Sequence, residues 1–255
     1  MKIRRTDPLL AAFAVVVACM TPASLFADEQ AAHWSYEGEE GPAHWGEISD
    51  DFHMCKDGRN QSPINLKHDV DAELPELVLD YYSSPNLVTN NGHTIQLDLD
   101  SGSYLRIPSR GSSFELKQFH FHSPSEHTIN GKSFAMEMHF VHADEYGELA
   151  VVGVMIDEGE ENPVLNQLRG FMPEHAGESK KPPIGIQETD LLPPTRDYFY
   201  YSGSLTTPPC SEGVGWIVLK KSIEASADQI ALFKDRLGPA TNRPIQPHNA
   251  RLVLD

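Results

Sequence analysis

Basic residues are scarce in this chain of 255 residues, which carries 20 Lys and Arg against 37 Asp and Glu and has a formal net charge of -17. A protein that binds nucleic acid needs a basic face to neutralise phosphates, so the composition excludes a nucleic-acid partner. The acidic excess by itself indicates only a well-solvated surface. The function therefore has to be found in particular motifs.

Long apolar runs are also scarce. The one clear run, Leu9–Cys19, is too short to span a bilayer; it follows a basic start and precedes small residues that end near Ala27. This pattern predicts a signal peptide over residues 1–27, cleaved to leave a domain of residues 28–255. No other run is long enough to predict an integral membrane span.

Two other uses of the N-terminus stay open. The pair Arg4-Arg5 fits a twin-arginine export signal, and Val16-Val17-Ala18-Cys19 resembles a bacterial lipoprotein box that would lead to lipidation at Cys19. Simple cleavage after Ala27 is the preferred interpretation, because the small residues before it form an ordinary signal-peptide end.

Cysteine is nearly absent after the predicted signal, where only Cys55 and Cys210 remain. An even pair in an exported protein predicts a disulfide, and a buried free pair is the weaker alternative. Repeats and low-complexity linkers are absent as well, so the sequence predicts a single domain.

What the sequence does contain is a series of short apolar or alternating runs, which predict a mostly β protein. Asn162 followed by Pro163 predicts one helix start, with Val164, Leu168 and Phe171 on one face. Ser226 and Gln229 form a capping box for a second helix that ends at Gly238. The predicted strands are Leu77–Asp80, Thr94–Leu99, Tyr104–Ile107, Phe114–His122, Phe134–Val141, Leu149–Ile156 and Gly215–Leu219.

The most informative motif is the run Gln118-Phe119-His120-Phe121-His122. Side chains alternate along a strand, so His120 and His122 lie on one face. The turn signal Asn130-Gly131 then brings the next strand, with His139, close to them. Three imidazoles without Cys or carboxylate ligands leave a fourth position for water, which is typical of a catalytic zinc site.

Two further side chains support this zinc site. Gln118 precedes His120 by two residues, and Glu137 precedes His139 by two, so each lies on the same strand face as its histidine. Metal-bound imidazoles usually donate their second ring nitrogen to such groups.

These residues resemble an α-class carbonic anhydrase of the exported bacterial type. The resemblance implies one domain on a large, twisted, mostly antiparallel central sheet with a few short surface helices. Its motifs cover essentially all of the predicted mature chain: Trp34-Ser35-Tyr36, Gly41–Trp45, Gln61–Ile64, Asn91-Gly92-His93, the two histidine strands, Ser123–His127, Ser204–Pro209, Trp216–Lys220 and Asn242–Pro247.

The resemblance also implies roles for particular residues. One Zn²⁺ per chain is expected on His120, His122 and His139, oriented by Gln118 and Glu137. Thr206 is expected to donate its hydroxyl proton to Glu126 and to accept from zinc-bound hydroxide, while Thr207 orders water and His93 acts as the proton shuttle. The expected substrate pocket consists of Gln96, Val141, Val151, Leu205, Val214 and Trp216.

The implied function is reversible hydration of carbon dioxide to bicarbonate and a proton, a lyase reaction, with slow ester hydrolysis as a side activity. The partner is then a small molecule, and the location is periplasmic or secreted in a bacterium. The exported bacterial branch includes homodimers, so the resemblance leaves a homodimer open.

Three other classes of protein share part of this pattern. A cupin would use His120, His122 and Glu126 as ligands to iron or manganese, but its second motif, Pro-x-Gly followed by His and Asn, is missing. A catalytically silent carbonic-anhydrase-like binding module would have lost zinc ligands, whereas all three histidines are present. A broader zinc hydrolase stays open.

Overall fold

The computed structural model describes residues 32–108, 111–182, 186–238 and 240–255, and Ala32–Asp255 forms one compact unit. The predicted signal peptide, with its alternatives at Arg4-Arg5 and Cys19, lies outside the described residues. Among the described residues, none of the helices combines the length and the apolar character that crossing a membrane requires.

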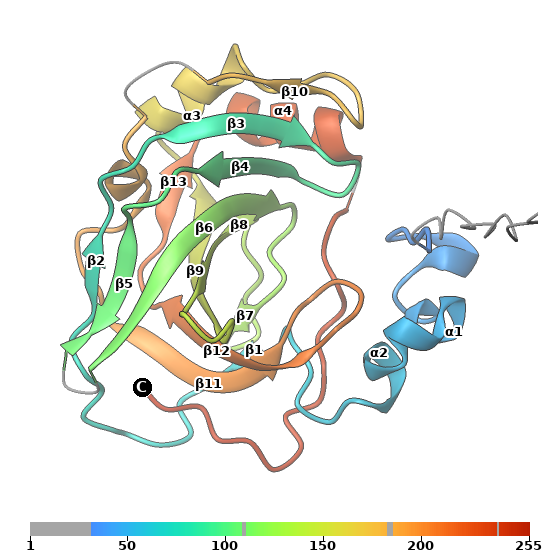
Figure 1. Ribbon diagram of the computed structural model, residues 1–255. Helices are drawn as coiled ribbons and strands as arrows, with labels where there is room; N and C mark the ends of the chain where they lie inside the picture. Colours follow the sequence, from blue (N-terminus) through green and yellow to red (C-terminus); the bar gives the residue numbers. More distant parts are fainter. Residues whose placement is uncertain (1–31, 109–110, 183–185, 239) are drawn as a thin grey trace, which may run out of the picture. The chain divides into compact units, whose positions relative to one another are not determined.

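A twisted sheet of 11 strands forms the centre of this unit (Figure 1). Its main path runs in the order β10-β3-β4-β6-β8-β9-β12-β11, with β5 pairing β6 and β2, and β13 pairing β9. The strands are β2 (Val78–Asp80), β3 (Pro85–Asn90), β4 (Ile95–Leu99), β5 (Tyr104–Ile107), β6 (Ser112–His122), β8 (Met136–Ala143), β9 (Leu149–Glu158), β10 (Ser179–Lys180), β11 (Tyr198–Ser204), β12 (Glu212–Leu219) and β13 (Ile223–Ala225).

Most strand pairs in this sheet are antiparallel. Within the described part of the chain, β9 runs parallel to β12 and β13, and the other pairs of the large sheet are antiparallel. A separate small sheet joins β1 (Asn65–Leu66) to β7 (Thr128–Ile129) in parallel. The predicted fold class, a mostly β domain on a large and mostly antiparallel sheet, is therefore confirmed.

The two faces of the sheet bury different sets of side chains, because alternate residues of each strand point to opposite sides. Phe119 and Phe121 of β6 and Phe140 of β8 belong to the larger apolar cluster. Val151 of β9 and Trp216 of β12 belong to a second, smaller cluster. His120, His122 and His139 alternate with these phenylalanines along β6 and β8, so their side chains point to the second face.

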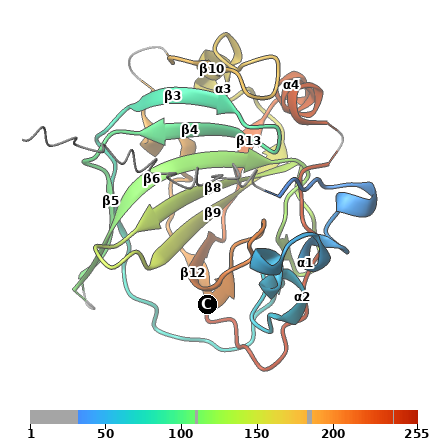
Figure 2. The ribbon, with the colours of Figure 1, turned by 45° about the vertical axis from the view of Figure 1, so that its right-hand side comes forward.

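Helices cover the first face. α3 (Pro163–Arg169) and α4 (Ala227–Leu237) lie near β3 and β10 (Figure 2), and the Phe233 ring of α4 packs 4.7 Å from the Phe121 ring. The 3₁₀ helix η4 (Glu188–Leu191) adds Leu191 to the same apolar cluster.

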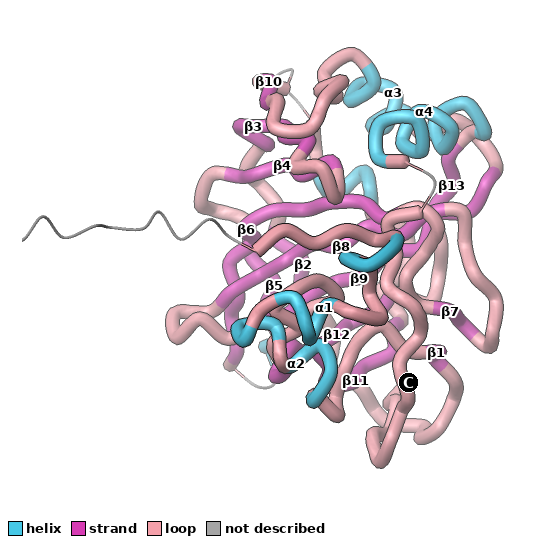
Figure 3. The backbone as a smooth tube through the Cα atoms, turned by 90° about the vertical axis from the view of Figure 1, so that its right-hand side faces the viewer, coloured by secondary structure: helices cyan, strands magenta, loops and turns pink. Residues whose placement is uncertain are grey.

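A second group of helices lies near the start of the described chain (Figure 3). It consists of η1 (Gly38–Glu40), α1 (Trp45–Ile48), η2 (Asp50–Phe52) and α2 (Met54–Asp57). A disulfide joins Cys55 of α2 to Cys210, with 5.0 Å between the Cα atoms, so the predicted Cys55–Cys210 bond is confirmed. The disulfide fixes this helical group to the segment that follows Thr206 and Thr207.

Candidate metal centre

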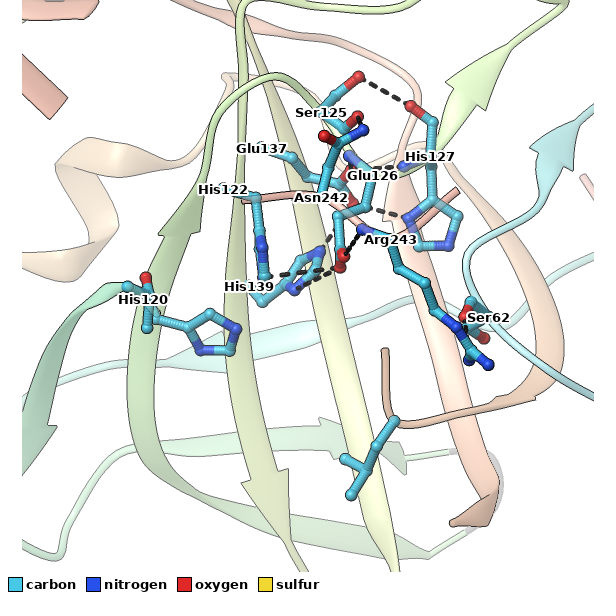
Figure 4. Close-up of polar contacts among 12 residues, drawn as sticks. Ser62, His120, His122, Ser125, Glu126, His127, Glu137, His139, Asn242 and Arg243 are labelled. Carbon is cyan, nitrogen blue, oxygen red and sulfur yellow. Dashed lines mark hydrogen bonds and ion pairs between the residues drawn. The ribbon is translucent and has the colours of Figure 1, made fainter. Parts of the chain in front are cut away.

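The three histidines of the motif converge on one point. Strands β6 and β8 are antiparallel neighbours, and the register places His120 directly opposite His139. One ring nitrogen from each of His120, His122 and His139 lies within 4.8 Å of the other two. Figure 4 shows the three imidazoles projecting from the two neighbouring strands.

The second nitrogen of each imidazole is held by an acceptor. His120 Nδ1 lies 2.8 Å from Gln118 Oε1, His122 Nδ1 lies 2.5 Å from the Thr241 carbonyl oxygen, and His139 Nε2 lies 2.8 Å from Glu137 Oε1. These oxygens only accept, so each of these ring nitrogens donates. The lone pairs of His120 Nε2, His122 Nε2 and His139 Nδ1 are therefore left for a metal.

Burial and charge favour neutral imidazoles at this point. Burial, followed by the neighbouring imidazoles, holds the pKa of His120 well below its usual range. Burial likewise lowers the pKa of His122, although Glu126 opposes this. His122 Nε2 is buried and has no hydrogen-bond partner, a cost that a metal ion would remove. The donor set therefore fits a metal ion that prefers neutral imidazole.

Glu137 connects this site to a buried hydrogen-bond network. Its carboxylate accepts from the backbone N–H groups of Glu126 and His127 at 2.9 and 2.8 Å, and from His127 Nδ1 at 2.7 Å. Burial opposes the charge, but His127 and His139 outweigh it and hold the pKa of Glu137 well below its usual range. His127 Nε2 also contacts Tyr201 Oη at 2.6 Å. Because these atoms pair with one another, His127, Glu137 and His139 form a hydrogen-bond network rather than a second metal site.

Glu126 lies beside the histidines with one oxygen free of hydrogen bonds. Its Oε1 accepts from the Arg243 backbone N–H at 2.9 Å, whereas its buried Oε2 has no hydrogen-bond partner. Oε2 lies 3.5 Å from His122 Nε2 and 3.9 Å from His139 Nδ1. Thr206 is buried, but no hydrogen bond joins it to Glu126 among the described residues. That bond stays a prediction.

A small cavity of about 140 Å³ opens beside the histidines. The predicted site residues His93, Gln96 and Thr207 line it together with His120 and His122. The His93 imidazole stacks on the Trp34 indole with 3.7 Å between ring centroids and 9° between planes. Burial, followed by the charge of His33, lowers the pKa of His93. The structure thus places His93 in the cavity wall, apart from the three converging imidazoles.

The predicted apolar pocket residues also come together. Val151, Val214 and Trp216 are buried in one cluster, against which Val141 and Leu205 pack. The Trp216 ring lies 4.8 Å from the His139 ring. Gln96 lies opposite His120 on β4, but its amide donates to Asp98 Oδ1 at 2.6 Å.

Three contributions were not predicted from the sequence: the Thr241 carbonyl, the Arg243 backbone N–H and the Trp34 stack. Thr241 and Arg243 act through backbone atoms, which leave no residue-type signal. Trp34 belongs to the motif Trp34-Ser35-Tyr36, but nothing in that motif indicates its contact with His93.

Fold and site together define a β-sheet protein with a metal-capable three-histidine centre. The family model of eukaryotic-type carbonic anhydrases matches residues 40–255. The chain belongs to this family. The resemblance indicated by the motifs is confirmed, and the cupin alternative is not favoured.

Bacterial relatives extend this match over nearly the full chain. The carbonic anhydrase of Klebsiella pneumoniae is 45% identical over 242 residues, which covers 95% of this chain and 97% of the relative. The carbonic anhydrase of Neisseria gonorrhoeae is 41% identical over 253 residues and covers 98% of each chain. The predicted enzyme class, carbonic anhydrase, agrees with these relatives.

A solved structure agrees with the fold. The α-carbonic anhydrase of Thermovibrio ammonificans, solved in complex with sulfanilamide, superposes with a TM-score of 0.85 at 48% identity. The match covers 88% of this chain and 99% of that one.

Proposed function

We propose that the protein catalyses reversible hydration of carbon dioxide with one Zn²⁺ held by His120, His122 and His139. The observation that carries this proposal is the convergence of one nitrogen from each of the three imidazoles. The other nitrogen of each ring donates a hydrogen bond to a fixed acceptor. Neutral imidazoles leave the full charge on a zinc ion, which would acidify a water molecule enough to supply hydroxide near neutral pH.

Glu126 and Thr206 are the groups proposed to orient the attacking oxygen. The Glu126 carboxylate is anchored by the Arg243 N–H, and its second oxygen is available as an acceptor. An ionised carboxylate only accepts, so Thr206 would donate its hydroxyl proton to Glu126 and present an oxygen lone pair toward the nucleophile. Thr207, in the cavity wall, would help to order water.

The apolar cluster is the proposed substrate pocket. Carbon dioxide has no net charge, so a wall of aliphatic and aromatic side chains is sufficient to hold it next to the histidines. Anionic bicarbonate matches that wall poorly and is released. The proposed wall comprises Val141, Val151, Leu205, Val214 and Trp216, with Gln96 as a polar residue at its side.

His93 is the proposed proton shuttle. Each turnover releases one proton, and an imidazole in the cavity wall can pass it from ordered water to buffer. Its lowered pKa favours release of that proton. We also propose slow ester hydrolysis as a side activity, because the same nucleophile attacks activated carbonyl groups.

We also propose that the protein is exported from the cell that makes it. Residues 1–27 would be removed as a signal peptide, and the mature protein would act in the periplasm or outside a bacterial cell, where the Cys55–Cys210 disulfide persists. A homodimer is the quaternary state to be tested, by light scattering of the mature protein.

The test combines zinc analysis with stopped-flow hydration of carbon dioxide by purified mature protein. We expect about one zinc per chain and fast hydration, and we expect His120→Ala, His122→Ala and His139→Ala each to lose both. His53→Ala, which changes an exposed histidine of the N-terminal helical group, should keep both. Zinc-loaded protein without hydration activity would instead support a silent binding module.

A further inference from the structure

The short segment of residues 241–243 supplies backbone atoms to two different side chains of the site. The Thr241 carbonyl oxygen accepts from His122 Nδ1 at 2.5 Å, and the Arg243 N–H donates to Glu126 Oε1 at 2.9 Å. Thr241 and Arg243 are both buried. The positions of the His122 ring and of the Glu126 carboxylate therefore depend on where this segment lies.

The Arg243 side chain connects the segment to a distant part of the chain. Figure 4 shows it extending from the Glu126 carboxylate to Ser62. Its Nη1 donates to Gln61 Oε1 at 2.8 Å and to the Ser62 carbonyl at 2.9 Å, and its Nη2 donates to the Cys55 carbonyl at 3.1 Å. One guanidinium thus attaches segment 241–243 to three residues that lie more than 180 positions earlier.

These three acceptors are themselves fixed. The disulfide holds Cys55 to Cys210, and the Gln61 amide donates to the Cys210 carbonyl at 3.0 Å. The N–H of Ser62 donates to Ser204 Oγ at 2.9 Å, and the N–H of Ser204 donates back to Ser62 Oγ at 3.1 Å. The guanidinium therefore joins the segment to a part of the domain that is already cross-linked.

Arg243 buries its charge against neutral acceptors, one amide oxygen and two carbonyl oxygens. Burial lowers its pKa to about 10, an effect that the charge of Glu126 opposes, so the guanidinium stays protonated at neutral pH. It also lies over the Trp45 ring, 5.7 Å from the centroid. Burying a charge in this way costs free energy, and an apolar side chain would pack at lower cost. The contacts of the guanidinium, rather than packing alone, account for an arginine at this position.

We propose that the Arg243 side chain is a positioning residue that holds segment 241–243 in place and so orients the His122 ring and the Glu126 carboxylate together. This inference rests on the proposed function, in which His122 binds zinc and Glu126 orients the attacking oxygen. Arg243 acts only through the backbone of its own segment. Without the guanidinium, the Thr241 carbonyl and the residue 243 N–H remain but lose their fixed positions.

The test compares Arg243→Ala with Arg251→Ala. Arg251 is the matched control, because its guanidinium also donates to backbone carbonyls, those of Gln61, Ser202 and Pro247, at 2.8 to 3.2 Å. Zinc affinity is measured by chelator competition, well below both melting temperatures. Arg243→Ala should weaken it about 10-fold, the lower end for loss of an orienting group, and should lower kcat/KM of the zinc-loaded enzyme. Arg251→Ala should lower the melting temperature but keep the parent's zinc affinity and kcat/KM.

Chemical rescue separates a local role from general damage. Guanidinium chloride at millimolar concentration, far below the molar range that unfolds proteins, can occupy the space left by the side chain. It should restore part of the zinc affinity of Arg243→Ala and leave Arg251→Ala and the parent unchanged. A loss of affinity that guanidinium does not reduce would count against the positioning role.

A second measurement needs neither zinc nor turnover. In metal-free protein, the His122 Nδ1–H resonance, identified by its absence in His122→Ala, reports on the hydrogen bond to the Thr241 carbonyl. Its exchange with solvent should be faster in Arg243→Ala and parent-like in Arg251→Ala. If Arg243→Ala does not fold, Arg243→Lys replaces it, since lysine keeps the charge but lacks the forked donors and should weaken zinc binding several-fold.

Parent-like zinc affinity and ring N–H exchange in the Arg243 variant would overturn the proposal. Equal losses in Arg251→Ala would overturn it as well, because they would show general destabilisation. Failure of the proposed function looks different. The parent would then not hydrate carbon dioxide, while the exchange of the His122 ring N–H would still show whether Arg243 orients that ring.

Discussion

Gln118 is the side chain that holds the His120 ring, through a 2.8 Å contact to Nδ1. We predict that Gln118→Ala weakens zinc affinity about 10- to 100-fold, the usual cost of losing such an orienting group, while zinc still binds. Competition with a fluorescent chelator measures this. Gln96→Ala is the matched control, because Gln96 lies opposite His120 but its amide bonds Asp98. Equal zinc affinities for the two variants would contradict the orienting role.

Glu188 is a buried carboxyl whose two oxygens have no hydrogen-bond partner, and burial raises its pKa to about 7. The unfolded chain loses this proton near pH 4.3, so the stability that the protonated group contributes is fully present below that pH and is lost as pH rises through about 7. Glu188→Gln removes the charge. It should melt roughly 2–4 °C above the parent at pH 8.5, or about 1 kcal/mol, and close to it at pH 4.

Calorimetry at both pH values checks this expectation. Glu73→Gln removes a carboxylate from an exposed position and serves as the control for net charge. A Glu188→Gln gain of the same size at both pH values would show that titration of Glu188 is not its cause.

At the scale of elements, one side chain links the N-termini of α3 and α4. Gln229 Oε1 accepts from the N–H groups of Ser226 and Asn162, both at 3.0 Å, and its amide donates to the Asn162 carbonyl at 2.8 Å. Gln229→Ala leaves these groups unpaired, at about 1–3 kcal/mol for each buried group. We predict a loss of about 2 kcal/mol or more in urea unfolding. Exposed Lys234→Ala should stay within about 0.5 kcal/mol of the parent.

Gln229 also shows which contacts could be predicted from the sequence and which could not. The spacing of Ser226 and Gln229 correctly predicts the capping box of α4, because that box is local. The contact to Asn162 spans 67 residues, and no local pattern encodes it. The helix at Asn162 starts as predicted but ends at Arg169, so Phe171 lies beyond it.

The strands, too, could be predicted where the pattern that forms them is local. All seven predicted strands are present, although some of their boundaries shift by a few residues. Six strands of the described residues were missed. Four of them, β1, β7, β10 and β13, have only two or three residues. Of the two longer ones, β3 begins with a proline, and β11 is an aromatic run that ends in Ser-Gly-Ser. Asn130 and Gly131 adopt φ values of 51° and 81°, as their turn signal predicts. However, the turn closes β7 rather than joining β6 directly to β8.

For the site, the sequence predicts which side chains gather but not which backbone atoms do. His120, His122, His139, Gln118 and Glu137 could be predicted because strand alternation is a local rule. The carbonyl of Thr241 reaches His122 across 119 residues and carries no side-chain signature. It depends on how the chain returns to the sheet after α4.

At the scale of the whole molecule, the Cys55–Cys210 disulfide closes a loop of 155 residues. We predict that the double variant Cys55→Ser/Cys210→Ser loses about 2–5 kcal/mol of stability while it retains zinc, because the proposed zinc ligands lie on β6 and β8. Thermal unfolding and zinc analysis of both proteins measure this. Treatment of the parent with reductant should lower its melting temperature in the same way, whereas loss of zinc from either protein would contradict the assignment.

The alternation of phenylalanine and histidine along β6 also constrains the register in which β6 pairs with β8. If β6 slipped by one residue against β8, Phe119 and Phe121 would turn into the cavity, and His120 and His122 would enter the apolar cluster against α4. The three imidazoles converge in one register only. In the proposed zinc enzyme, the free energy of cation binding at that point would stabilise the correct strand alignment and none of the slipped ones, so the proposed metal centre would also favour accurate folding.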